Sequence, residues 1–274
     1  MQTSVIPDTP RRVLLNSDMG EGLGLHEFGN DDALMRIIDV ANVACGYHAG
    51  DPDVMNRTVA LAAEHGVAVG AHPGLPDVVG FGRRRMVLSP GEVESIILYQ
   101  TGALAAFLAK HGLELNHIKP HGALYGMLAG DDELMQAAAG TAKQFGVPFY
   151  GLAGTAHESV CRAMGVEFVP ELYVDLNYGP AGELLIQRRP APTDPVAAAE
   201  RVRRALAGQP ILAVDGTELD ISFQSICIHS DAPNSVAVAT AVRAVLGWLR
   251  IIQPSEREQP RGNHRLPAPR NFLP

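Results

Sequence analysis

The stretch GAHPG at residues 70–74 sets a histidine in a glycine–proline turn directly after an apolar, strand-like run. Two other stretches repeat this pattern, ACGYHAGD at residues 44–51 and KPHGALY at residues 119–125. Further apolar runs lead into titratable side chains at Asp18, Asp175 and His229. Parallel barrels place their functional side chains at the carboxyl ends of many strands. The repeated pattern therefore predicts one site at the shared end of these strands.

Seven short apolar runs predict the strands of this barrel. They cover residues 13–15, 40–44, 67–69, 115–118, 147–152, 166–174 and 221–228. Between the strands lie segments whose apolar residues recur at helical spacing. Strict alternation of strand and helix predicts a parallel sheet, because each helical crossover returns the chain to begin the next strand in the same direction.

Helix start signals precede the helical segments. Ser89 and Glu92 have the spacing of a capping box with Pro90 at the first helical position, and Gly112 ends that helix. Aspartate, threonine or asparagine stands at the expected starts of the other helices. The seven expected starts are Asp31, Asp51, Ser89, Asp131, Thr155, Asp194 and Asn234.

Two arrangements satisfy a parallel sheet covered by helices: an open doubly wound sheet and a closed barrel. An open sheet gathers ligands at one switch point, often beside a glycine-rich phosphate loop. The glycines of NSDMGEGLG at residues 16–24 do not fit the dinucleotide fingerprint, and no glycine–lysine pair exists for a P-loop. We therefore predict an α/β fold, a distorted seven-stranded (β/α) TIM-like barrel. Residues 211–214 are expected to form a hairpin with the last strand.

Length and composition suit one domain. The chain has 274 residues, of which 46% are hydrophobic, and we expect a single barrel at residues 13–252 between a flexible N-terminus at 1–12 and a flexible tail at 253–274. A formal charge of −8 opposes nucleic-acid binding. No apolar run is long enough for a membrane span, and the first residues lack a signal-peptide core. Three cysteines without paired spacing favour a reduced, cytoplasmic protein.

Lys119 and His121 follow the fourth predicted strand, and both are predicted to be catalytic. A lysine at this position stabilises a developing negative charge or a phosphate, or else pairs structurally with a barrel carboxylate. His121 is held between Pro120 and Gly122. It is a candidate general acid, general base or metal ligand.

Two carboxylates and two histidines complete the predicted chemistry. Asp18 and Glu21 follow the first strand, and either can orient and deprotonate water. His72 is predicted to be catalytic or else structural, and His48 to bind substrate beside a helix start that favours anions. Imidazole and carboxylate ligands suit zinc, manganese or nickel, so a divalent metal is a candidate cofactor. Its candidate ligands are Asp18, His48, His72 and His121.

The loop VGFGRRRM at residues 79–86 is expected to lie over the same barrel mouth. Arg83 or Arg84 can clamp a carboxylate or phosphate with two hydrogen bonds, or else is a surface charge. Three more strand-end residues complete the predicted substrate-binding set. They are Asp175, His229 and Asp231, the last of which alternatively caps the final helix.

Six stretches together resemble the LamB/YcsF family, which forms one component, called A, of bacterial 5-oxoprolinase. They are NSDMGEG at 16–22, ANVACGYHAGDP at 41–52, GAHPGLPDVVGFGRR at 70–84, ILYQTGAL at 97–104, KPHGALY at 119–125 and SICIHSD at 225–231. The resemblance implies a barrel akin to glycoside hydrolases and polysaccharide deacetylases. It also implies ATP-dependent opening of 5-oxoproline to glutamate, with ATP as co-substrate and subunits B and C as partners.

The chain departs from the family pattern at several positions. Leu14 replaces an aspartate, Ser17 a cysteine and Ser230 a glycine, and Leu176 stands where an arginine is expected. The last change removes a guanidinium from anion or partner recognition. Two other functions stay open. One is a metal-dependent deacetylase or amidohydrolase acting without ATP on another lactam or amide, and the other is a non-catalytic subunit that binds substrate.

Overall fold

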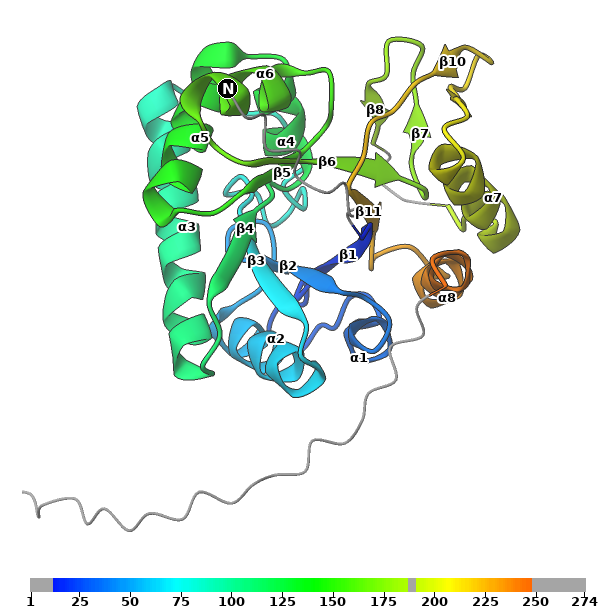
Figure 1. Ribbon diagram of the computed structural model, residues 1–274. Coiled ribbons are helices and arrows are strands. Elements are labelled where there is room, and N and C mark those ends of the chain that lie inside the picture. The colour runs from blue at the N-terminus through cyan, green and yellow to red at the C-terminus, as the bar shows by residue number, and fades with distance from the viewer. Residues whose placement is uncertain (1–11, 187–190, 248–274) are drawn as a thin grey trace, which may run out of the picture.

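Seven parallel strands close into a barrel at the centre of the molecule (Figure 1). The computed structural model describes residues 12–186 and 191–247. The barrel strands are β1 (Leu14–Met19), β2 (Val40–Ala44), β3 (Ala68–His72), β4 (Leu115–Ile118), β5 (Phe149–Gly151), β6 (Phe168–Tyr173) and β11 (Ser225–Ile228). The predicted α/β fold and seven-stranded barrel are confirmed.

The strands follow the order β1-β11-β6-β5-β4-β3-β2 around the barrel. The first and last strands close it: Ser17 of β1 is in register with Ile228 of β11 on one side and with Ala41 of β2 on the other. Since all these pairings are parallel, the carboxyl ends of the strands open on one face of the barrel. Side chains that follow the strands are therefore brought together there.

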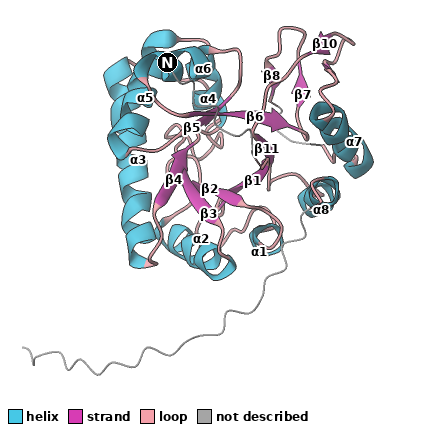
Figure 2. Cartoon of the chain, in the orientation of Figure 1, coloured by secondary structure: helices cyan, strands magenta, loops and turns pink. Residues whose placement is uncertain are grey.

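The helices cover the outside of the barrel (Figure 2). Their bounds are α1 (Asp31–Met35), α2 (Pro52–His65), α3 (Pro90–Lys110), α4 (Gly122–Ala129), α5 (Asp132–Phe145), α6 (Ala156–Met164), α7 (Pro195–Leu206) and α8 (Ser235–Val245). Neighbouring helices pack on one another, α3 on α5 and α7 on α8. Each buries an apolar stripe, as α3 does with Ile97, Leu104 and Leu108, and this burial stabilises the ring of helices.

The predicted start signals act as caps at most helices. A side-chain oxygen accepts a hydrogen bond from a backbone N–H of the first turn at Asp51, Ser89, Asp131, Thr155 and Asp194. The helices expected at Asp31 and Asn234 also begin there, but without a side-chain cap. Instead, the Asp31 carboxylate accepts from the N–H of Gly20 at 2.7 Å. This bond ties α1 to the loop that carries Glu21.

Two local elements differ from expectation. Helix α4 has no counterpart among the predicted helices, because His121 precedes it without a side-chain cap and so lacks the signal that marks the others. The prediction that residues 211–214 form a hairpin with the last barrel strand is wrong, because they pair with a different segment. β9 (Ile211–Leu212) pairs with β10 (Glu218–Leu219), because a turn closed by the Gly216 N–H to the Ala213 carbonyl reverses the chain before the last strand begins.

A second short hairpin joins β7 (Asn177–Tyr178) to β8 (Leu184–Leu185) beside the barrel. Among the described residues, no helix is long and apolar enough to cross a membrane. The predicted flexible segments at 1–12 and 253–274 lie outside the described residues, except for Arg12, whose guanidinium pairs with Asp39 at 2.7 Å.

The barrel interior below the strand ends is polar. The Asn16 amide donates to the Glu171 carboxylate at 2.9 Å, and the Asn42 amide donates to the Asn16 carbonyl oxygen at 2.8 Å. His117, stacked on Tyr150, donates from Nε2 to the Asn42 oxygen at 2.8 Å. Buried polar groups with satisfied hydrogen bonds hold a fixed geometry. This network forms a rigid layer beneath the side chains at the strand ends.

Candidate active site

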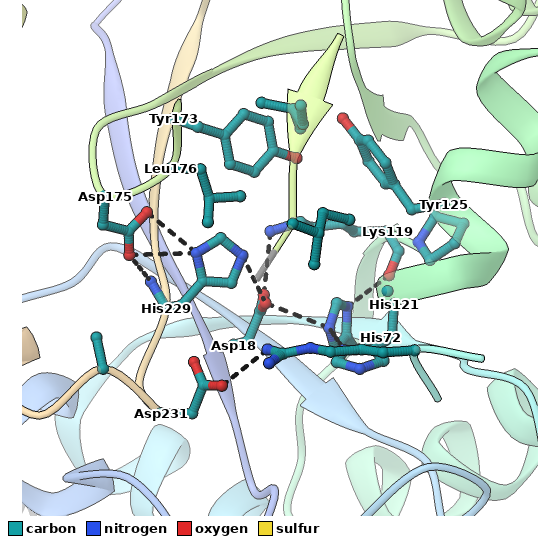
Figure 3. A pocket seen from close by; sticks show the side chains of 16 residues that line it. Asp18, His72, Lys119, His121, Tyr125, Tyr173, Asp175, Leu176, His229 and Asp231 are labelled. Carbon is teal, nitrogen blue, oxygen red and sulfur yellow. Dashed lines mark hydrogen bonds and ion pairs between the residues drawn. The ribbon is translucent and has the colours of Figure 1, made fainter. Parts of the chain in front are cut away.

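A pocket at the carboxyl ends of the strands gathers most of the predicted site residues (Figure 3). Those that line it are Asp18, His72, Arg83, Lys119, His121, Asp175, His229 and Asp231. Glu21, His48 and Arg84 lie on an adjoining hollow that also includes Arg83 and Asp231. The fold thus brings the residues from separate strand ends to one side of the barrel.

Asp18 and Lys119 form a buried ion pair in the pocket (Figure 3). Lys119 Nζ lies 3.0 Å from Asp18 Oδ1, and Asn42 donates to the same oxygen at 2.8 Å. Burial acts to raise the pKa of Asp18, but its contacts with His72 and Lys119 outweigh burial and hold that pKa well below its usual value. Burial likewise opposes the charge of Lys119, yet Asp18 and its other neighbours keep the pKa of Lys119 well above its usual value.

His229 lies between two carboxylates. Its Nδ1 is 3.0 Å from Asp175 Oδ1, and its backbone N–H donates to Asp175 Oδ2 at 2.6 Å. Its Nε2 faces Asp18 Oδ2 at 3.6 Å. Burial acts against the charged ring, but the charge and hydrogen bonds of Asp175 outweigh it and raise the pKa of His229 to about 9. His229 is therefore a cation at neutral pH, oriented toward the pocket.

Glu21 and three histidines form a second cluster next to Asp18. One ligand atom from each of Glu21, His48, His72 and His121 lies within 4.8 Å of the others. Glu21 Oε1 is 3.2 Å from His48 Nε2 and 3.3 Å from His121 Nδ1. Burial and the charge of Asp18 raise the pKa of Glu21 well above its usual value. Burial lowers the pKa of His48 and of His121.

Of the four metal-ligand candidates, His48, His72 and His121 belong to this cluster, together with Glu21. Asp18 falls in a different group, with Cys227 and His229, whose possible ligand atoms also lie within 4.8 Å of one another. Asp18 Oδ2 still lies 3.4 Å from His72 Nε2. His72 is thus the contact between the two groups.

The two arginines of the 79–86 loop take different positions. Arg83 lines the pocket and its guanidinium donates to Asp231 Oδ2 at 2.7 Å. Arg84 instead pairs with the buried carboxylate of Asp77, which also accepts from the N–H of Gly80 at 2.9 Å. The structure therefore places Arg83 on the pocket, whereas Arg84 fastens the loop.

Several residues of the site are not among those predicted from the sequence. Tyr125 and Tyr173 line the pocket, and the Tyr173 hydroxyl donates to Glu171 at 2.9 Å. Lys119 Nζ also donates to Cys227 Sγ at 2.9 Å and lies 3.5 Å from Glu171 Oε1. Glu171 stands within the apolar run at residues 166–174. A charged residue in such a run is the only sequence signal that it has a role in the site.

Cys45 is buried, and burial raises the pKa of its thiol to about 12. A thiol with a raised pKa is a poor nucleophile. Leu176 lines the pocket next to Asp175, so the position where the family pattern has an arginine faces the site. Its carbonyl accepts a hydrogen bond from Arg201 at 2.6 Å.

The model of the LamB/YcsF family matches residues 13–255 of the chain. The chain belongs to the LamB/YcsF family. It is 44% identical over 241 residues to the lactam utilization protein lamB of Emericella nidulans, covering 86% of this chain and 94% of that protein. It is 45% identical over 239 residues to the A component of 5-oxoprolinase from Thermus thermophilus, covering 86% and 96%.

A solved structure of this family has the same fold. The crystal structure of the lactam utilization protein from Thermus thermophilus superimposes with a TM-score of 0.80 at 44% identity, covering 86% of this chain and 96% of that one. Membership of the LamB/YcsF family confirms the resemblance carried by the six sequence stretches.

Proposed function

We propose that this chain is the A component of an ATP-dependent 5-oxoprolinase, which opens 5-oxo-L-proline to L-glutamate together with subunits B and C. The observation that carries the proposal is the buried Lys119–Asp18 pair at the strand ends of a chain 44–45% identical to proteins named as this component of 5-oxoprolinase. The names of these relatives indicate the substrate class, and the Lys119–Asp18 pair provides charged groups suited to amide hydrolysis.

The reaction needs ATP because an unactivated lactam is a poor electrophile. In the proposed sequence the γ-phosphoryl group of ATP, bound largely by the partner subunits, passes to the lactam oxygen and ADP leaves. Water then adds to the ring carbon, the C–N bond breaks, and the ring nitrogen takes a proton. A second water hydrolyses the resulting acyl phosphate to glutamate and phosphate. Phosphorylation thereby activates the ring carbon before water attacks it.

The residues of the pocket suit these steps. The Lys119 ammonium stabilises negative charge on the activated oxygen, and Asp18 beside it orients the attacking water. His229, a cation at neutral pH because its pKa is about 9, is the candidate donor of the proton to the ring nitrogen. Arg83 is the candidate partner for the substrate carboxylate. Glu21, His72 and His121 stay candidates for proton transfer or for binding a cation.

The test is glutamate release by the complex of this chain with its B and C subunits, with and without ATP. Lys119→Met should lower kcat by about 100-fold or more, because it removes a positive charge next to the reacting oxygen. Lys110→Met is the matched control, since Lys110 is exposed and bonds Asn56 on the outside of the barrel. Full activity of folded Lys119→Met, with 5-oxoproline still bound, would favour the non-catalytic role instead.

A second candidate function is supported by the cluster of Glu21, His48, His72 and His121. Such a set of imidazole and carboxylate groups suits a metal-dependent amide hydrolase or deacetylase that works without ATP. The same assay separates the two functions. Product formed by the isolated chain from a lactam or an acetylated amine, with metal but without ATP, would favour this alternative.

A further inference from the structure

We infer that Glu21, His72 and His121 form a binding site for one divalent transition-metal ion, with His48 as a positioning residue for Glu21. The inference goes beyond the proposed function, since it concerns binding by this chain alone and needs neither the lactam nor ATP. It commits to a different ligand set from the four residues predicted from the sequence, because it includes Glu21 and leaves Asp18 and His48 outside the coordinating atoms.

Backbone carbonyls fix which ring nitrogen of each histidine is available. His72 donates its Nδ1–H to the carbonyl of Lys119 at 2.7 Å, and His121 donates its Nε2–H to the carbonyl of Phe81 at 2.8 Å. A carbonyl oxygen only accepts, so both protons are assigned by the fold. The remaining nitrogens, His72 Nε2 and His121 Nδ1, then carry lone pairs when the rings are neutral.

These two lone-pair nitrogens lie only 3.0 Å apart. Two neutral imidazoles in this arrangement repel each other unless a cation lies between the nitrogens. The same pattern, in which one ring nitrogen is held by a carbonyl and the other is directed at a shared point, is how proteins orient histidine ligands for a metal. The cation is therefore either a shared proton or a metal ion.

The position of the Glu21 carboxylate favours a metal ion over a shared proton. Glu21 Oε1 lies 3.3 Å from His121 Nδ1, and its side chain is buried. Ligand atoms about 2.1 Å from a metal are about 3.0 Å apart at right angles and about 3.4 Å apart in a tetrahedron. The observed separations of 3.0 and 3.3 Å match these edges. A proton shared by the two histidine nitrogens would not require the Glu21 oxygen to lie at this distance.

His48 is close but is not a coordinating residue. Its ring stacks on that of His121 with centroids 3.7 Å apart and an angle of 1° between planes, so one ion cannot lie in the plane of both rings. Its Nε2 lies 3.2 Å from Glu21 Oε1, which positions that carboxylate. The two rings pack closely against Gly82, because a Cβ at that residue would lie 2.7 Å from His48 and 2.9 Å from His121.

The ligand set indicates the class of metal. Two imidazoles and one carboxylate with further positions open suit zinc, manganese, iron, cobalt or nickel, whereas calcium and magnesium prefer oxygen ligands. His72 and His121 also line the pocket that contains Asp18 and Lys119. The open coordination positions would therefore be close to the substrate.

The test is direct metal binding by the full chain without partners or substrate. After removal of metal with a chelator, titration calorimetry with ZnCl₂ and the visible spectrum with CoCl₂ should give one ion per chain, with a rise in Tm. His121→Ala and Glu21→Gln should each weaken binding by about 100-fold or more, and His48→Gln by about 10-fold, as for residues that position a ligand. His111→Gln, at a surface histidine bonded to Asn56, should bind as the wild type does.

A wild-type chain that is folded and binds less than about a fifth of an equivalent of zinc and cobalt would overturn the inference and assign the contact to a shared proton. Binding unchanged in both His121→Ala and Glu21→Gln would overturn it too, by placing the metal elsewhere. Neither result depends on glutamate release. A failure of the metal site and a failure of the 5-oxoprolinase function are therefore distinguishable.

Discussion

Lys119 Nζ lies 3.0 Å from Asp18 Oδ1 inside the barrel mouth, where both side chains are almost fully buried. Breaking a buried pair leaves one charge without its partner, which costs about 3–5 kcal/mol. Lys119→Met should therefore lower the free energy of unfolding by about 3 kcal/mol. This loss is at the lower end of the range because His229 and Asn42 still contact Asp18. Urea unfolding measures this loss.

The double variant Asp18→Asn with Lys119→Met tests the same pair. It removes both charges, so its unfolding free energy should be higher than the sum of the two single losses predicts. Its activity should not return, because neither charged group remains. Strictly additive losses would show that the two side chains do not stabilise one another.

His229 gives the protein a pH-dependent contribution to stability. Its pKa is raised from 6.5 to about 9, so its contribution is fully present below about pH 6.5 and is lost as the pH rises through about 9. The charged groups that face it are Asp175, Asp18 and Lys119. His229→Gln should cost about 1–3 kcal/mol at pH 6 and progressively less toward pH 9.5.

Urea unfolding of the wild type and His229→Gln at several pH values is the measurement. Asp175 also accepts from the backbone N–H of residue 229, and this bond survives the substitution. The variant therefore isolates the ring. A difference between the two proteins that stays constant from pH 6 to 9.5 would contradict the raised pKa.

Arg83 and Arg84 are adjacent in the sequence but should differ in function. Arg83 lines the pocket, so Arg83→Ala should raise KM for 5-oxoproline by about 10-fold or more through the loss of a charged hydrogen bond. Arg84 pairs with Asp77, so Arg84→Ala should lower Tm while leaving KM within about twofold. Steady-state kinetics and thermal unfolding of the two variants compare them directly. Equal effects on KM would contradict the assignment.

Leu176 occupies a pocket position where the family pattern has an arginine. Leu176→Arg would bring a guanidinium next to Asp175 and the substrate pocket. It should lower KM for an anionic lactam by about 10-fold or more, since a charged hydrogen bond contributes about 1.5–3 kcal/mol. Leu176→Met is the control for side-chain length. A KM for 5-oxoproline that rises in the arginine variant alone would indicate that this pocket selects a less polar substrate.

Much of the barrel is predictable from the sequence because its signals are local. Capping residues such as Ser89 and Asp131 act within one helical turn, and apolar runs locate the strands. Helix α4 is missed because His121, which precedes it, donates to a distant carbonyl instead of capping the helix.

The candidate site is predictable only in part. Residues that directly follow apolar runs, such as Asp18 and Lys119, are found because strand ends converge. Glu171 and Asn42 are missed because their position inside the barrel depends on which way each strand faces, and the apolar run hides it. The directions of His72 and His121 depend on the carbonyls of Lys119 and Phe81, which only the folded chain brings near.

We propose that this chain supplies catalytic groups for ATP-dependent opening of 5-oxoproline. The most direct measurement is glutamate release by the reconstituted complex, with this chain as wild type, as Lys119→Met or omitted, each with and without ATP. We expect release at the full rate only with the wild-type chain and ATP together, and a rate lower by about 100-fold or more with Lys119→Met. Equal ATP-dependent release with the Lys119→Met chain, or without the chain, would contradict it.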